Sequence, residues 1–184
     1  MKKSVMVIVL VLMFGWTVYH FVLNTDDLSA EDDNNESGNS TDIEVGLELG
    51  NMAPDITVKT FEGEDVHLSD FRGERVMLNF WASWCGPCRA EMPDMEKFHQ
   101  NTDVKILAVN LIETESNEQQ VLSFIEEYGL TFPVFLDEGN AAATTYRIQP
   151  VPTTFLINSD GTIHNKAFGA LNYELMVQEF AKMK

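Results

Sequence analysis

The only two cysteines of this chain, Cys85 and Cys88, stand two residues apart between an apolar run and a run of helix formers. Residues 76–81 (Val-Met-Leu-Asn-Phe-Trp) are typical of a buried strand, and residues 89–92 favour a helix. Pro87 falls in the first helical turn, where its missing N–H costs no hydrogen bond. The pattern predicts a strand that delivers Cys85 to the start of a helix.

A Cys-X-X-Cys pair serves either as a zinc ligand pair or as a redox centre. Zinc needs four ligands, and this chain has no third cysteine and only four scattered histidines. A redox pair needs only a helix start, whose free N–H groups and dipole favour a thiolate. The redox interpretation is therefore favoured, and a zinc site shared across a dimer or a structural disulfide stay open as alternatives.

The N-terminus carries an apolar stretch, residues 5–23, directly after Lys2 and Lys3. Its length suits a membrane-spanning helix, and no small-residue cleavage pattern follows it. We expect an uncleaved transmembrane anchor over residues 1–24 with the lysines on the cytoplasmic side. A cleaved signal peptide is the alternative.

Residues 25–45 are acidic and polar, which predicts a flexible tether, and residues 46–184 form the expected folded domain. The formal net charge of −17 argues against nucleic acid as a partner and against electrostatic binding to anionic lipid. The chain is thus expected to be an anchored, acidic protein with one domain.

Strand and helix patterns alternate through the predicted domain. Strands are expected at 56–59, 65–68, 75–81, 104–110, 132–136, 153–158 and 162–168, and helices from the cysteine motif to about 100 and at 117–128, 141–146 and 172–183. The first two strands form a hairpin, and Val121, Leu122, Phe124 and Ile125 mark the inner side of the 117–128 helix. This order predicts an α/β fold with a central mixed sheet, parallel in part and flanked by helices on both faces.

Three motifs together resemble thioredoxin: residues 80–88 (Phe-Trp-Ala-Ser-Trp-Cys-Gly-Pro-Cys), Pro93 within the helix, and residues 151–155 (Val-Pro-Thr-Thr-Phe) before a strand. The N-terminal apolar stretch, the opening hairpin, an insert around residues 110–130, Asn79 and Glu91 resemble the membrane-tethered TlpA and ResA branch, which is related to AhpC/TSA proteins. The resemblance covers the region from about 46 to 184 and implies a thioredoxin-like fold.

The resemblance assigns roles around the cysteine pair. Cys85 is the exposed nucleophile and Cys88 the buried resolving thiol, with Glu91 as proton acceptor for Cys88. The alternative for Glu91 is a surface carboxylate favoured by the helix dipole. Pro152 is expected to be cis and to face the cysteines, which leaves the backbone of Val151 free to pair with an extended substrate. Trp84 is expected to shape the substrate surface, and neither a metal nor a cofactor is implied.

The remaining tryptophan of the motif, the proline within the helix and two histidines are expected to have structural roles only. Trp81 is expected in the core, Pro93 to kink its helix, and His99 and His164 to be surface or satisfied residues.

The Gly-Pro dipeptide between the cysteines is that of thioredoxin, which is strongly reducing at about −270 mV, whereas the oxidant DsbA is near −120 mV. The resemblance therefore implies a reductant of protein disulfides outside the cytoplasm, fed by a transmembrane thiol donor of the CcdA or DsbD type. Its clients are apocytochrome c or a spore-envelope protein, and a monomer is the default expectation.

Three other functions compete on the same fold. An oxidant or isomerase of exported proteins remains open. A peroxidase of the peroxiredoxin type has threonine where this chain has Ser83. A copper-assembly protein of the Sco group needs Cys-X-X-X-Cys.

Overall fold

The computed structural model describes residues 11–19 and 43–184. Residues 11–19 are helical and belong to one unit, Met1–Thr41, while Asp42–Lys184 form the second. No helix within the described ranges has the length and apolarity needed to cross a membrane. Most of the predicted anchor and nearly all of the predicted tether lie outside the described residues.

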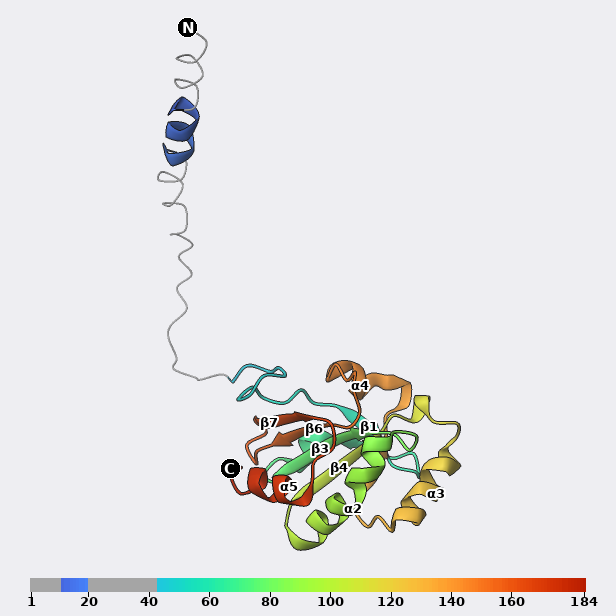
Figure 1. Cartoon of the computed structure of the whole chain (residues 1–184). Helices are drawn as coiled ribbons and strands as arrows, with labels where there is room; N and C mark the ends of the chain where they lie inside the picture. The colour runs from blue at the N-terminus through green and yellow to red at the C-terminus, as the bar shows by residue number, and fades with distance from the viewer. Residues whose placement is uncertain (1–10, 20–42) are drawn as a thin grey trace. The chain divides into compact units, whose positions relative to one another are not determined.

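The second unit is built on a seven-stranded mixed sheet with the strand order β2-β1-β5-β4-β3-β6-β7 (Figure 1). The strands are β1 (Thr57–Lys59), β2 (Asp65–His67), β3 (Val76–Trp81), β4 (Lys105–Asn110), β5 (Val134–Leu136), β6 (Thr153–Ile157) and β7 (Ile163–Phe168). Strands β3, β4 and β5 run parallel, and the other pairings are antiparallel. The predicted α/β class, the mixed sheet and the opening hairpin are confirmed.

Helices cover both faces of this sheet. They are α2 (Gly86–Asn101), α3 (Glu118–Tyr128), α4 (Ala141–Thr145) and α5 (Tyr173–Phe180), with short 3₁₀ turns η1 (Leu68–Phe71), η2 (Ile112–Thr114) and η3 (Glu138–Asn140). Figure 1 shows α2 and α5 side by side below the sheet and α4 above it. Residues of α2, α3 and α5 share one hydrophobic cluster, whereas residues of α4 and η1 belong to the other.

Strand β3 lies between these two clusters. Met77 and Trp81 pack toward α2, and Leu78 and Phe80 pack toward the opposite face. Successive side chains of a strand point to opposite faces, so a strand covered on both sides is apolar throughout. This explains why residues 76–81 are apolar except for Asn79, and it places the cysteine motif at the end of the most buried strand.

Helix α3 begins and ends at the predicted signals. The side chain of Asn117 accepts the N–H of Gln120, and Gly129 ends the helix in the left-handed conformation at φ 60°. Val121 and Phe124 are buried, but Leu122 is exposed, so its predicted inner position is wrong. It lies about 100° around the helix from Val121, outside the buried stripe.

Two element bounds differ from expectation by more than one residue. The last helix ends at Phe180 rather than 183, because Lys182 and Met183 donate to carbonyls three residues back and the N–H of Lys184 donates to Asn158. Strand β5 starts at Val134, after Pro133, which has no N–H to give to a ladder.

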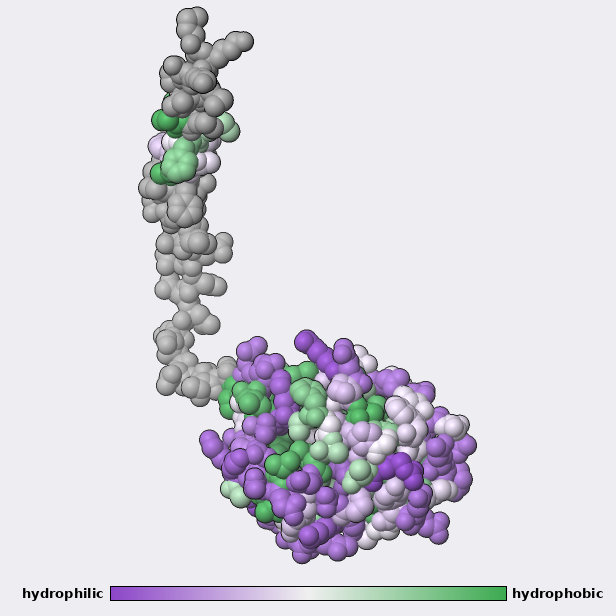
Figure 2. All heavy atoms as spheres, viewed as in Figure 1, coloured by the Kyte–Doolittle hydropathy of each residue, from purple (hydrophilic) through white to green (hydrophobic). Residues whose placement is uncertain are grey.

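Hydrophilic residues cover most of the visible face of the domain, and hydrophobic residues form small separate patches between them (Figure 2). This agrees with the excess of acids in the sequence.

Candidate functional site

Cys85 stands at the junction between β3 and α2. The strand ends at Trp81, three residues follow, and Cys85 is the residue that caps the N-terminus of α2. Its Sγ accepts the backbone N–H of Cys88 at 3.1 Å. Pro87 lies in the first turn, as predicted. The sulfur therefore sits where free N–H groups and the helix dipole stabilise negative charge.

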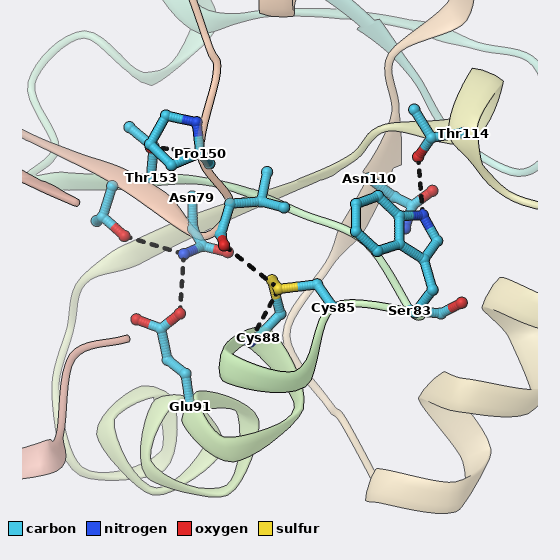
Figure 3. The surroundings of a disulfide bond; sticks show 12 residues. Asn79, Ser83, Cys85, Cys88, Glu91, Asn110, Thr114, Pro150 and Thr153 are labelled. Carbon is cyan, nitrogen blue, oxygen red and sulfur yellow. Dashed lines mark hydrogen bonds between the residues drawn. A yellow bond between two sulfur atoms is a disulfide. The ribbon is translucent and has the colours of Figure 1, made fainter. Parts of the chain in front are cut away.

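Cys85 and Cys88 form a disulfide (Figure 3). Cys88 is fully buried and Cys85 is 4% exposed. The expected order of accessibility holds, but Cys85 is far less exposed than expected. The carbonyl oxygen of Val151 lies 3.4 Å from its Sγ and covers it.

That carbonyl belongs to the segment before β6. The Val151–Pro152 peptide bond is cis, as expected. Pro152 is buried and Val151 is half-buried. The structure thus brings the backbone of Val151 next to the sulfur of Cys85, although the two residues are far apart in the sequence.

Glu91 lies three residues after Cys88 on α2 and is only 1% exposed. Its Oε1 accepts the N–H of Leu171 at 3.0 Å, and its Oε2 accepts Nδ2 of Asn79 at 3.3 Å. Burial raises the pKa of Glu91 to about 7, against the opposing effect of these two hydrogen bonds. The surface-carboxylate alternative is therefore wrong, while the part of Glu91 in proton transfer stays a prediction.

Asn79 connects this carboxylate to the sheet. It is fully buried in β3, and its Nδ2 also donates to Oγ1 of Thr154 in β6 at 2.9 Å. Figure 3 shows Asn79 between Glu91 and the β6 segment. Its Oδ1 has no partner in the described part of the chain. A buried acceptor is thus available beside a carboxylate that titrates near neutrality.

The sequence did not reveal Glu115, which lies in the insert. Its Oε1 accepts the N–H of Ser83 at 2.6 Å and Nδ2 of Asn110 at 2.8 Å, and its Oε2 accepts the hydroxyl of Ser83. Gln120 donates to the same hydroxyl at 3.0 Å. This carboxylate fixes the loop just before Cys85. A single acid within an acidic chain carries no local signal, so only the fold identifies it.

Trp84 and Trp81 differ in exposure, as expected. Trp84 is 55% exposed beside Cys85, and its Nε1 donates to Oγ1 of Thr114 in η2 at 3.1 Å. Trp81 is fully buried, with its ring centroid 4.9 Å from that of Phe124. The insert therefore orients the one tryptophan that faces solvent at the site.

The other singled-out residues lie away from the disulfide chemistry. Pro93 is inside α2. Nε2 of His164 lies 3.7 Å from Glu179. His99 is half-buried, and its Nδ1 is buried without a partner in the described chain, so the expectation of a surface or satisfied residue is wrong for His99. No three His, Cys, Asp or Glu side chains within 11–19 and 43–184 are placed to hold a metal ion.

The arrangement suits thiol-disulfide exchange. A thiolate at Cys85 can attack a disulfide sulfur and form a mixed disulfide, and Cys88 can then displace the substrate thiol. The disulfide observed here is the product of that second step.

Known proteins are similar to this chain in sequence and in fold. Residues 49–166 match the model of the AhpC/TSA family. The thioredoxin-like protein YneN of Bacillus subtilis is 41% identical over 74% of this chain and 81% of its own length. The thiol-disulfide oxidoreductase ResA of Geobacillus thermodenitrificans is 32% identical over 99% of this chain and 94% of its own.

Among solved structures, StoA from Bacillus subtilis is 35% identical with a TM-score of 0.61, covering 69% of this chain and 96% of its own. With the disulfide at the start of α2, the cis-proline segment beside it and the match over most of the chain, this protein belongs to the AhpC/TSA family as a ResA-like thiol-disulfide oxidoreductase of thioredoxin fold.

Proposed function

We propose that this protein reduces disulfide bonds of other proteins on the outer side of the cell membrane. The observation that carries the proposal is the placement of Glu91, a buried carboxylate with a pKa of about 7, one helical turn from the buried Cys88. A reductant must deprotonate its resolving thiol in every turnover. A carboxylate that titrates near neutrality is suited to accept that proton.

The reaction balances as follows. The Cys85 thiolate attacks one sulfur of the substrate disulfide, and the other substrate sulfur leaves as a thiolate. Cys88 transfers its proton to Glu91, attacks Sγ of Cys85 and releases the second substrate thiolate. The two substrate thiolates gain protons, and the protein is left with the Cys85–Cys88 disulfide. Two electrons must then return to this disulfide, and we assign that step to a transmembrane thiol donor of the CcdA or DsbD type.

The substrate would bind along the segment before β6. The backbone of Val151 lies beside Sγ of Cys85, so an extended segment that pairs with this backbone would bring its own sulfur to the nucleophile. Trp84, which precedes Cys85 and is exposed, would contact the same segment.

The proposed location rests on the sequence. The apolar stretch at residues 5–23 is long enough to span a membrane, and the acidic residues 25–45 would tether the folded domain 46–184 outside it. The similarity to ResA of Geobacillus thermodenitrificans spans 99% of the chain, so it includes this N-terminal region. We propose a single-pass, monomeric membrane protein, whose clients are apocytochrome c or another envelope or spore protein.

The reduction potential tests the direction of electron flow. We expect a value below about −200 mV, in the range of reductants, because the Gly-Pro dipeptide is that of thioredoxin. A value near −120 mV would instead establish the oxidant alternative.

Trapping in the native cell envelope identifies the client. Cys88→Ser should hold substrates on Cys85 as mixed disulfides, which mass spectrometry can identify. Cys85→Ser is the matched control, since serine also caps a helix N-terminus, and it should trap nothing. Capture by the control but not by Cys88→Ser would reverse the two roles.

A further inference from the structure

A groove of about 400 Å³ opens directly beside the disulfide and has no part in the exchange chemistry described above. Trp84 and Val151, which flank Cys85, form one end of it. Leu111 and Ile148 add apolar side chains to the lining, and residues of α4 together with Arg147 just after it contribute further lining residues. Because the groove shares two residues with the redox site, a segment whose cysteine reaches Cys85 would also pass over it.

Arg147 is exposed in this groove without an ionic partner among the described residues. Most other cations of the domain are paired, as Arg75 is with Asp103 and Arg89 with Glu127. No acidic residue lines the groove. The carboxylate of Glu113, on the neighbouring turn η2, accepts the N–H of Gly139 instead. In a strongly acidic chain, the groove therefore presents a single available positive charge.

The backbone conformation at Arg147 is a second, independent feature that is typical of a binding site. Asn140 and Arg147 are the only non-glycine residues with positive φ in the described chain, at 56° and 52°, and both line the groove. Arg147 follows Tyr146, the residue that caps the C-terminus of α4, and its N–H donates to the carbonyl of Thr144 while that of Ile148 donates to the carbonyl of Ala143. Glycine is strongly favoured at such a helix end, since a Cβ disfavours the left-handed region. Here the position is occupied by an arginine, whose Cβ makes this conformation unfavourable. Residues in such strained conformations are concentrated at binding sites.

We propose that this groove selects substrates in which an apolar residue and a carboxylate stand close to the attacked cysteine. The apolar side chain occupies the space between Leu111, Ile148 and Val151, and the carboxylate pairs with the guanidinium of Arg147. This rests on the proposed function, because it names the sequence that the reductant prefers. The acidic surface elsewhere would repel such a segment, so Arg147 also fixes where it can bind.

The test uses reduced full-length protein in detergent and short peptides with one cysteine, blocked as a mixed disulfide with uncharged 2-mercaptoethanol. A leucine and one variable residue, Glu, Gln or Lys, stand next to the cysteine, in one series before it and in another after it. The second-order rate constant of reduction is measured for each peptide. Ratios between peptides are compared within each variant, so that any general change in reactivity cancels.

In one of the two series, we expect the Glu peptide to react roughly three- to fivefold faster than the Gln peptide, and the Lys peptide to be slowest. The preference should shrink at high salt, because the pair is exposed. Arg147→Gly should abolish it, and Arg147→Glu should invert it in favour of Lys. Arg147→Gly also removes the unfavourable Cβ, so a lost preference in that variant cannot be ascribed to unfolding.

Lys105→Gln is the matched control. This variant removes the same charge from an exposed residue at the start of β4, whereas Leu111 of the groove follows the end of that strand. It should keep the preference for Glu. Equal rates for the three peptides in both series, or a preference that survives in Arg147→Gly, would overturn the groove proposal. If reduced wild-type protein failed to reduce every peptide, including the Gln form, the proposed reductase function itself would fall.

Discussion

Helix α2 carries two buried carboxylates, one on each side of Pro93, and their titration is shifted in opposite directions. Glu91 is 1% exposed and its pKa is raised to about 7, whereas Glu96 is 8% exposed and its pKa is lowered. In both cases burial is the largest influence and raises the pKa. The difference arises because Glu91 is the more deeply buried of the two and because Glu96 receives more hydrogen bonds; the nearby charges of Asp94, which raises the pKa of Glu91, and of His99, which lowers that of Glu96, act in the same directions.

Glu96 receives three short hydrogen bonds, from the N–H and the hydroxyl of Thr131 at 2.8 and 2.6 Å and from Gln100 at 2.7 Å. Glu91 receives two longer ones, at 3.0 and 3.3 Å. Donors to the charged form outweigh burial at Glu96 and fail to do so at Glu91. The first half of α2 thus holds a group ready to exchange protons, and the second half holds one that joins the helix to the segment before β5.

The largest effect is expected at Cys88, in the first half of the helix. Cys88→Ser should lower steady-state reduction of a protein disulfide by at least roughly 10³-fold, because no thiol remains to resolve the mixed disulfide. An insulin-type turnover assay measures this. Turnover within tenfold of wild type would show that the chemistry does not depend on this half of the helix.

Glu91→Gln should slow the resolving step by about 10²-fold at pH 7, since the buried acceptor of the Cys88 proton is lost. Single-turnover decay of a preformed mixed disulfide, followed from pH 5 to 9, measures the step. In wild type the rate should rise through a pKa near 7, and this step should vanish in the variant. An unchanged pH–rate profile would show that Glu91 does not accept the proton of Cys88 and has only a structural role.

The pH dependence of the unfolding free energy of the oxidised protein reports on Glu91 without a contribution from the cysteines, because they do not titrate while they form the disulfide. The folded pKa of Glu91 is above its unfolded value of about 4.5, so the folded state binds the proton more tightly. The stability from this group is full below pH 4.5 and is lost as pH rises to 7, by roughly 3 kcal/mol.

Glu91→Gln should remove this dependence. Urea unfolding at several pH values should show the variant gaining on wild type between pH 5 and 7 and then levelling off. The unpartnered Oδ1 of Asn79 can accept from the new amide if the Asn79 side chain flips. A difference that is flat with pH would mean that the carboxylate is ionised throughout.

The smallest effect is expected at Glu96. Glu96→Gln presents an amide to donors that now meet a carboxylate, and should cost about 1–2 kcal/mol of unfolding free energy. Its lowered pKa gives the opposite sign to Glu91: stability present above pH 4.5 is lost on acidification. Thermal unfolding and turnover per folded molecule measure the two properties. A loss of turnover without a loss of stability would show that Glu96, which follows Pro93, takes part in the exchange reaction.

How well the sequence predicts these features depends on how local their causes are. The strand at β3, the start of α2 and the end of α3 at Gly129 follow from burial periodicity, Pro87 and a glycine C-cap, all readable within a few residues. The cis bond at Pro152 has no local signal, and only the family resemblance predicts it.

The remaining features depend on distant partners. The exposure of Leu122 does not follow from the apolar pattern of the helix, because that pattern does not show which edge of the apolar stripe is covered. The opposite behaviour of Glu91 and Glu96 depends on Leu171 and Thr131, which lie far along the chain. The contacts of Glu115 with Ser83 are of the same kind.

The capping of α2 by the sulfur of Cys85 links redox chemistry to folding through a thermodynamic cycle. The cycle has four steps: reduction of the disulfide in the folded chain, reduction in the unfolded chain, and unfolding of the oxidised and of the reduced form. The free energies of reduction in the two states therefore differ by the difference between the two unfolding free energies. A thiolate cap favours the folded reduced form, and a protein whose reduced form is stabilised is a stronger oxidant. The electron-donating power of the protein is therefore limited by how firmly the start of its own helix holds the negative sulfur.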